Sequence, residues 1–389
     1  MPCKPAISSH SLGRAWSHSL PTKLDAAASH SLSLELFHED LVYLAATFPG
    51  GPTPSNQLLA AQTIRSLCSA RNISIISLQP FMHYEGLRDR ELHEARIREM
   101  RDLWIPLARA LGTRVIAVPS SFLGEEECGG DEGVIVRDLR ELADLGVAAA
   151  SSSSDDDDGK GEGEGDIIFA YEALCWGTHI STWEQSWEIV QKVSRSNFQI
   201  CFDTFNLAGK VFADPMRPGG IKKNAEEAME ATLRRILERV DVRRIAYIQV
   251  VDAERLSTPL IKGHEFYHED QPARMSWSRN CRLFYGEEDR GAYLPVYAIL
   301  KTLLVDLGFE GYVSAEVFHR DLGKDDRSVP EEFAQRAKRS WEKIVEDFGL
   351  ERGGEEKVAV VEEGAAGRSA GGVVDRFPAV EGAAARAQL

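Results

Sequence analysis

FQICFDTFN, residues 198–206, carries the pattern from which the fold can be predicted, because a short apolar run ends directly in an acid. Three other stretches have the same form: IIFAYEAL at 167–174, IAYIQVVDA at 245–253 and YVSAEVF at 312–318. Continuous apolar strands of this kind are typical of a parallel sheet that is buried on both faces. The stretches therefore predict an α/β protein with a parallel sheet.

Apolar runs that predict strands recur along the chain at 5–8, 33–37, 73–78, 114–118, 167–171, 198–202, 245–251 and 312–318. Amphipathic, helix-favouring stretches lie between most of them, at 56–70, 90–111, 132–146, 182–193, 224–239, 295–307 and 330–348. Eight alternating units fit a closed (β/α)₈ TIM barrel better than an open sheet, with residues 1–350 as its one domain. No GxGxxG follows any of the strands, which argues against a dinucleotide-binding fold.

Two intervals depart from this alternation. Residues 24–32 should hold a helix and a turn, but Ser29, His30 and Ser31 interrupt the pattern with no glycine to close it. The interval 252–294 has no helix pattern and is predicted to be a loop. Long loops after barrel strands are usually functional, because the loops at the carboxyl ends of the strands build the active site.

Two segments have a composition that predicts disorder: the acidic low-complexity insertion at 148–165 and the Ala/Gly-rich tail at 351–389. Both have too few apolar side chains to offset the entropy lost on ordering. Together they carry about half of the formal net charge of −16. The remainder is still acidic, which argues against a nucleic-acid partner, since neutralising phosphates needs a basic face.

The chain has no apolar run that approaches the ~18 residues of a membrane span, and no secretory signal is visible. A soluble, cytoplasmic protein without a membrane partner is therefore expected. Its six cysteines form no CxxC pair, which is typical of reduced thiols and not of a disulfide framework or zinc cluster. The sequence does not indicate an oligomeric state.

Polar residues interrupt or follow four consecutive apolar strands at the same depth: Glu172, Asp203, Gln249 and Glu316. Charged side chains are rarely buried unless they are paired or bound to a metal. One such acid alone could be satisfied by a salt bridge, but four polar groups in register can converge at the barrel mouth. This all-oxygen set predicts one divalent cation, with Mg²⁺ or Mn²⁺ preferred over Co²⁺ or Zn²⁺.

Several strings resemble the fungal 3-dehydroshikimate dehydratases of quinate catabolism, in the xylose-isomerase-like barrel superfamily: LELFHEDL (34–41), LQPF (78–81), YEALCW (171–176), FDTFN (202–206), IQVVDAE (248–254) and ARMSWSRNCRLFYGE (273–287). The resemblance runs from about Lys4 to about Asp347 and lapses at 26–33, in the insertion and in the tail. It implies the same four metal ligands. It also implies a hydro-lyase that converts 3-dehydroshikimate to protocatechuate.

A carboxylate substrate of this kind needs a cationic partner. Arg279 and Arg282 are the leading candidates, because a guanidinium binds a carboxylate through two parallel hydrogen bonds. The resemblance implies that Ser278 and Arg282 line the catalytic pocket. Gln79, after the strand at 73–78, and Glu35, inside the strand at 33–37, are predicted to be polar groups that bind or support the substrate.

The general base is harder to assign. Many relatives carry a histidine three residues after the acid of the strand at 198–202, where this chain has Asn206. An amide cannot accept a proton at neutral pH, so Asn206 is a candidate for substrate binding and the base must lie elsewhere. Residues that remain open for this role are His38, His83, His264, His268 and Glu316, with His83 and His264 as the catalytic candidates.

Three other functions are alternatives to a dehydratase. A metal-dependent sugar isomerase or epimerase would use the same four ligands, and only the arginines of segment 273–287 argue against it. An abasic-site endonuclease would need a His-rich three-metal cluster and a basic face, and neither is present. An inactive barrel that merely binds small molecules is disfavoured by the four intact ligands.

Overall fold

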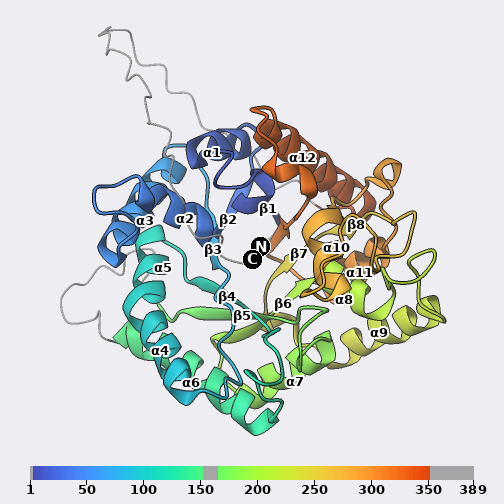
Figure 1. The fold of residues 1–389 in the computed structure, drawn as a ribbon, viewed down its shortest axis with the longest axis horizontal. Coiled ribbons are helices and arrows are strands. Elements are labelled where there is room, and N and C mark those ends of the chain that lie inside the picture. The colour runs from blue at the N-terminus through green and yellow to red at the C-terminus, as the bar shows by residue number, and fades with distance from the viewer. Residues whose placement is uncertain (1–2, 152–164, 351–389) are drawn as a thin grey trace, which may run out of the picture. The chain divides into compact units, whose positions relative to one another are not determined.

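Residues 3–151 and 165–350 are described by a computed structural model of the chain. Eight parallel strands close into a barrel in the order β1-β10-β7-β6-β5-β4-β3-β2, and helices surround it (Figure 1). The barrel strands are β1 (Lys4–Ser8), β2 (Ser33–Phe37), β3 (Ile75–Gln79), β4 (Val115–Pro119), β5 (Ile168–Glu172), β6 (Phe198–Asp203), β7 (Ile245–Gln249) and β10 (Tyr312–Ala315). The predicted (β/α)₈ TIM barrel is confirmed, and each strand lies on its predicted apolar run.

Helices follow the strands and cover the outside of the barrel (Figure 1). They are α1 (Leu20–Ser29), α2 (His38–Ala46), α3 (Pro54–Ser69), α4 (Arg90–Glu99), α5 (Ile105–Leu111), α6 (Glu132–Ser151), α7 (Trp183–Val193), α8 (Thr204–Val211), α9 (Ala225–Arg239), α10 (Ala273–Cys281), α11 (Val296–Leu300) and α12 (Val329–Phe348). A short 3-10 helix, η1 (Ser9–Leu12), follows β1. None of the helices in the described part of the chain is both long and apolar enough to cross a membrane.

The barrel interior is layered along the strands. A small apolar cluster, separate from the main core beneath the helices, consists of Ala6, Ile76, Ala170, Cys201 and Tyr247. Side chains two residues apart point to the same face of a strand, so the next layer toward the carboxyl ends is fixed by register. Four of the five positions reached in this way are polar, namely Ser8, Glu172, Asp203 and Gln249, while the fifth, Leu78, belongs to the main core. The alternation of side chains along the strands therefore places these polar groups at one level, at the barrel mouth.

The first βα unit is complete, although the sequence at 24–32 predicts an interruption. Ser19 caps α1 by accepting a hydrogen bond from the Thr22 amide, and Ser31 makes the left-handed turn (φ 53°) that a glycine was expected to supply. In the interior, Lys23 Nζ of α1 lies 2.6 Å from Asp40 Oδ1 of α2, and both side chains are buried. This ion pair joins the two helices, which explains why α1 forms despite its weak pattern.

The interval 252–294 is not the continuous loop that the sequence predicts. It contains α10, which begins after Pro272 and buries Trp277 and Ser278. Its many polar residues leave no apolar stripe, the pattern on which helix prediction depends. An antiparallel pair, β8 (Asp252–Ala253) with β9 (Arg282–Leu283), joins the two ends of the α10 excursion. The pairing returns the end of α10 to the barrel mouth.

The predicted acidic insertion at 148–165 lies outside the described residues except for 148–151, which continue α6, and Gly165. The tail at 351–389 lies wholly outside them. Disorder in both segments and the domain boundary at 350 stay predictions.

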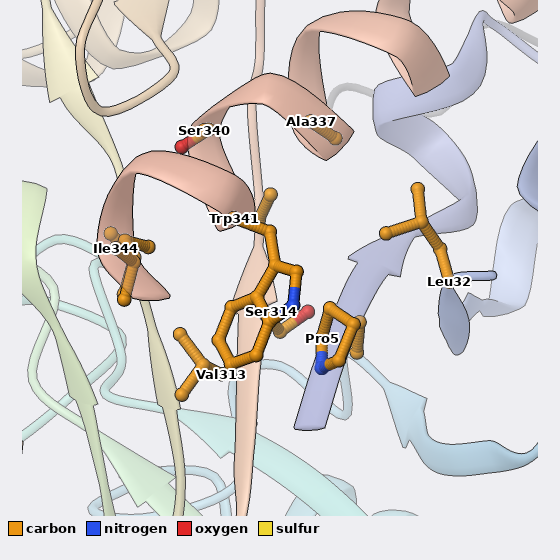
Figure 2. A pocket seen from close by; sticks show the side chains of 11 residues that line it. Pro5, Leu32, Val313, Ser314, Ala337, Ser340, Trp341 and Ile344 are labelled. Carbon is orange, nitrogen blue, oxygen red and sulfur yellow. The ribbon is translucent and has the colours of Figure 1, made fainter. Parts of the chain in front are cut away.

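A small pocket lies between α12 and the strands β1 and β10, on the outside of the barrel (Figure 2). The Trp341 side chain extends between Pro5 and Val313 in this view, and no charged side chain lines the pocket. It is therefore a packing gap beneath α12, without the polar anchors of a binding site.

The buried ion pair between Lys23 and Asp40 yields a stability prediction. Replacing Lys23 by Met leaves the Asp40 carboxylate buried without its cation, so we expect the free energy of unfolding to fall by about 3–5 kcal/mol. The matched control is Arg71→Met, because Arg71 pairs with the largely exposed Asp25; it should cost under about 1 kcal/mol. Urea denaturation measures both, and equal costs would contradict the assigned role.

A second stability prediction concerns Glu85, which is buried behind β5. Its Oε1 accepts hydrogen bonds from the Ser121 amide (2.7 Å) and the Tyr171 hydroxyl (3.1 Å). Burial raises the pKa of Glu85 from 4.5 to about 7. Between pH 4.5 and about 7, the Glu85 carboxyl is protonated in the folded protein but ionised in the unfolded chain. The stability that comes from the protonated Glu85 is therefore present below pH 4.5 and is lost as the pH rises through about 7.

Between about pH 4 and about pH 8, the free energy of unfolding of the wild type should fall by about 3 kcal/mol because of Glu85. The Glu85→Gln variant should not show this fall. The measurement is urea denaturation of wild type and variant at both pH values. Identical pH dependence in the two proteins would show that Glu85 does not carry a raised pKa.

Candidate active site

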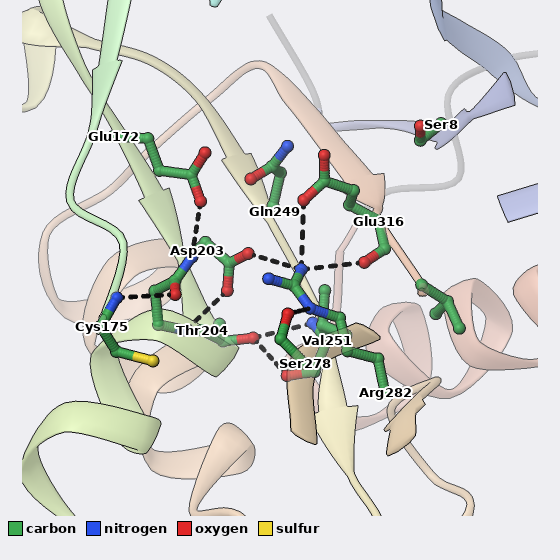
Figure 3. Close-up of polar contacts among 12 residues, drawn as sticks. Ser8, Glu172, Cys175, Asp203, Thr204, Gln249, Val251, Ser278, Arg282 and Glu316 are labelled. Carbon is green, nitrogen blue, oxygen red and sulfur yellow. Dashed lines mark hydrogen bonds and ion pairs between the residues drawn. The ribbon is translucent and has the colours of Figure 1, made fainter. Parts of the chain in front are cut away.

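Three carboxylates converge at the carboxyl ends of the barrel strands (Figure 3). Glu172 ends β5, Asp203 ends β6, and Glu316 follows β10 by one residue. One carboxylate oxygen from each lies within 4.8 Å of the others, and all three side chains are buried. Gln249, the last residue of β7, lies between Glu172 and Glu316 in Figure 3. The structure thus brings together the four side chains that the strand registers selected.

Arg282 reaches into this cluster from β9. Its Nη1 donates to Asp203 Oδ2 at 2.8 Å and to Glu316 Oε2 at 3.1 Å, while its side chain is 1% exposed. Its Nε donates to Ser278 Oγ at 2.9 Å. Nε and Nη1 are thus engaged by protein groups, while Nη2 makes no hydrogen bond with a described residue, and the predicted contact of Arg282 with substrate stays a prediction. Arg282 therefore balances charge inside the cluster.

The electrostatics of the cluster favour an additional cation. Burial and the nearby charge of Asp203, opposed by Arg282, together raise the pKa of Glu172 to about 8. Burial also raises the pKa of Glu316, again against the effect of Arg282. One guanidinium cannot neutralise three carboxylates, and unpaired buried charge is costly. The donor set therefore fits a divalent metal ion, because all its ligand atoms are oxygen.

Asn206 connects two of the strands that carry the acids. Its Nδ2 donates to Glu172 Oε1 at 2.6 Å, and its Oδ1 accepts a hydrogen bond from the Cys175 amide at 2.9 Å. Asp203 caps α8 by accepting from the Asn206 amide at 2.8 Å. Both ends of the Asn206 amide are thus bonded to protein. This residue orients Glu172, and its predicted role in substrate binding stays a prediction.

Glu35 and Gln79 lie beneath the cluster. Glu35 Oε2 accepts from Gln79 Nε2 at 3.0 Å and from Gln249 Nε2 at 3.1 Å. A carboxylate accepts only from the nitrogen of an amide, so these bonds fix which way the Gln249 amide faces. Gln249 Oε1 is then left without a partner among the described residues. Glu35 therefore presents the Gln249 oxygen as a free ligand atom.

The two predicted catalytic histidines lie in loops, where other groups hold them. His83 packs against Phe122, with ring centroids 4.4 Å apart, and burial lowers its pKa to about 4. His264 Nδ1 accepts a hydrogen bond from the Phe266 amide at 3.1 Å. Within residues 3–151 and 165–350, no hydrogen bond or ion pair joins either histidine to the cluster. Their catalytic role stays a prediction.

His10 is a mouth residue that the sequence reasoning missed. It lies in η1, directly after β1, and its buried ring packs between Phe37 (4.8 Å) and Phe318 (4.4 Å). The Arg282 guanidinium lies 5.1 Å from the same Phe318 ring. The rule that selected the acids, a polar residue just after an apolar strand, applies to His10 as well.

The charge balance in the cluster can be tested by removing Arg282. Arg282→Met leaves Asp203 and Glu316 buried without their guanidinium, so we expect the metal-free protein to lose about 3–5 kcal/mol of unfolding free energy. The matched control is Arg279→Met, since Arg279 is not in ion-pair contact with any described residue. Denaturation in the presence of a chelator measures both. If Arg282→Met lowers the free energy of unfolding no more than Arg279→Met does, the proposed charge balance is wrong.

The comparisons with known proteins agree with this geometry. The family model described as "Xylose isomerase-like TIM barrel" matches residues 32–344. The chain is 48% identical over 358 residues to the 3-dehydroshikimate dehydratase of Neurospora crassa, covering 90% of this chain and 96% of that one. It is 26% identical to the 3-dehydroshikimate dehydratase of Pseudomonas aeruginosa, covering 78% of this chain but 37% of that longer protein.

Solved structures show the same fold. A xylose isomerase-like TIM barrel/4-hydroxyphenylpyruvate dioxygenase fusion protein superposes with a TM-score of 0.63 at 24% identity, covering 90% of this chain and 44% of that one. The IOLI protein, solved with a binding zinc atom, gives a TM-score of 0.61 at 17% identity, covering 89% and 99%. The chain therefore belongs to the xylose isomerase-like TIM barrel family, together with the Neurospora crassa dehydratase.

Proposed function

We propose that this chain is a 3-dehydroshikimate dehydratase, a hydro-lyase that removes water from 3-dehydroshikimate to give protocatechuate in quinate catabolism. One observation carries the proposal: three buried carboxylates meet at the mouth of a barrel whose chain is 48% identical to a dehydratase of that name along 90% of its length. The substrate is thus a small carboxylated ring.

The proposed metal ligands are Glu172, Asp203 and Glu316 through carboxylate oxygens and Gln249 through Oε1. Hard divalent cations prefer this donor set, so Mg²⁺ or Mn²⁺ is favoured and Co²⁺ is a less favoured option. When bound, the cation would polarise the substrate ketone and so acidify the adjacent carbon–hydrogen bond. Loss of that proton and of the neighbouring hydroxyl, as water, leads to the aromatic product.

The chain's own residues prepare this chemistry. Asn206 holds Glu172, Arg282 holds Asp203 and Glu316, and Glu35 holds Gln249. Ligands that are fixed in advance lose no freedom when a cation or substrate binds. Ser278 keeps the Arg282 side chain in place.

Aromatic rings also confine Arg282. The Phe205 ring lies 4.5 Å and the Phe318 ring 5.1 Å from its guanidinium carbon. These rings exclude water around the charged groups, which strengthens their interaction. Ser278 and Arg282 remain the predicted pocket residues, and His83 and His264 remain the predicted groups for proton transfer.

The direct test is to incubate the purified protein with 3-dehydroshikimate and follow the ultraviolet absorbance of protocatechuate. We expect product with added Mg²⁺, Mn²⁺ or Co²⁺ and a loss of at least about 100-fold in Glu172→Gln, because one ligand charge is removed. Glu85→Gln is the matched control, since Glu85 bonds behind the same strand, to Tyr171, and it should keep its activity.

A thermal melt with and without the cation supplies a readout that does not depend on turnover. The cation should raise the melting temperature of wild type and of Glu85→Gln more than that of Glu172→Gln. If no protocatechuate forms with any of the three cations, the dehydratase proposal is wrong. Interconversion of ketose sugars under the same conditions would instead favour the isomerase or epimerase.

A further inference from the structure

Arg279 is a cation without a partner near the barrel mouth. It lies on α10 three residues before Arg282, and its side chain is partly buried. Its guanidinium makes no hydrogen bond or ion pair with any residue that the structure describes. Burial and, to a smaller extent, the charge of Arg14 together lower the pKa of Arg279 to about 10. A partly buried guanidinium beside a second one is unfavourable unless an anion binds there.

Arg14 approaches the mouth from the other side, from the turn that follows η1. Its Nη1 donates to His10 Nε2 at 2.8 Å, and its Nε is buried without a partner among the described residues. Gly13 makes the turn, with φ at 117°, and a Cβ there would lie 2.3 Å from His18 Cδ2. The turn that places Arg14 thus requires glycine.

His10 orients Arg14 and brings no negative charge to it. An arginine has only donors, so the His10 Nε2 must accept the hydrogen bond and the ring must be neutral. Burial lowers the pKa of His10, and Arg14 and Arg282 act in the same direction. The acids that act on Arg14 are Glu39 and Asp40 of α2. Asp40 already pairs with Lys23, and Glu39 forms no ion pair with Arg14.

Contacts connect Arg14 to the carboxylate cluster, and Arg279 lies on α10 three residues before Arg282. Arg14 bonds to His10, whose ring packs on Phe318, and Phe318 in turn lies beside the Arg282 guanidinium. Arg282 Nη1 and Nε are engaged by Asp203, Glu316 and Ser278. Arg14 Nε and the whole Arg279 guanidinium make no hydrogen bond with a described residue, so both arginines retain donors for an incoming anion, as does Nη2 of Arg282.

We propose that Arg14 and Arg279 form a carboxylate-binding subsite at the barrel mouth, with His10 as the residue that positions Arg14. The subsite would hold the ring carboxylate of the substrate while the opposite side of the ring faces Glu172, Asp203 and Glu316. This assignment of the ligand class rests on the proposed function. Two guanidinium groups suit a carboxylate because each presents a planar fork of donors.

The test compares two ligands that differ only in the carboxylate, protocatechuate and catechol. Calorimetric titration of the Mg²⁺- or Mn²⁺-loaded protein measures both dissociation constants. We expect wild type to prefer protocatechuate, and Arg14→Gln and Arg279→Gln each to weaken protocatechuate binding about 10- to 100-fold with catechol unchanged. Arg14→Lys should recover part of the preference. Arg243→Gln is the control, because Arg243 is 85% exposed.

Melting curves of each variant check that it is folded, and Arg14→Lys and Arg279→Lys replace any variant that is not. The subsite is overturned if wild type shows no preference for protocatechuate. It is also overturned if the glutamine variants keep that preference, or lose catechol affinity to the same extent. Failure of the proposed function is a separate result: wild type would make no protocatechuate from 3-dehydroshikimate, whatever the ratio of the two affinities.

Discussion

Three carboxylates share one buried space with a single guanidinium, and this unequal charge balance governs the rest of the mouth. Arg282 lies within 3.1 Å of both Asp203 and Glu316, whereas among the described residues Glu172 accepts a side-chain hydrogen bond from the amide of Asn206 alone. Burying such a cluster is unfavourable unless a further positive charge balances the remaining negative charge when the protein is active. The position of the acids at the strand ends thus points to a cation, and the polar residues around them hold that arrangement.

The supporting parts come from distant segments of the chain. The β8–β9 pairing returns the chain after α10 to the barrel, so that Arg282 enters from the long excursion and not from a barrel strand. Glu35 of β2 turns the Gln249 amide so that its oxygen stays free. Each acid or amide is thus oriented by a residue from another unit, which explains how a set of short side chains keeps one geometry.

Much of this could be predicted because strand geometry is periodic. An apolar run fixes the strand, and alternation fixes the face and depth of Glu172, Asp203, Gln249 and Glu316. Prediction failed where periodicity is missing. The α10 sequence has no apolar stripe, so its helix was not recognised. Arg282 has a long side chain that could reach the substrate or the acids, and sequence alone does not distinguish the two. His10 and Arg14 follow a short strand, in a turn whose course depends on Gly13.

The four mouth residues are proposed to hold a divalent cation. Anomalous X-ray scattering from crystals grown with Mn²⁺ tests it most directly, because the signal locates the ion without reference to activity. We expect one strong peak within coordination distance of Glu172, Asp203, Gln249 and Glu316, with Arg282 displaced from at least one acid. A peak elsewhere, or none at these residues in an enzyme that turns over, would contradict it.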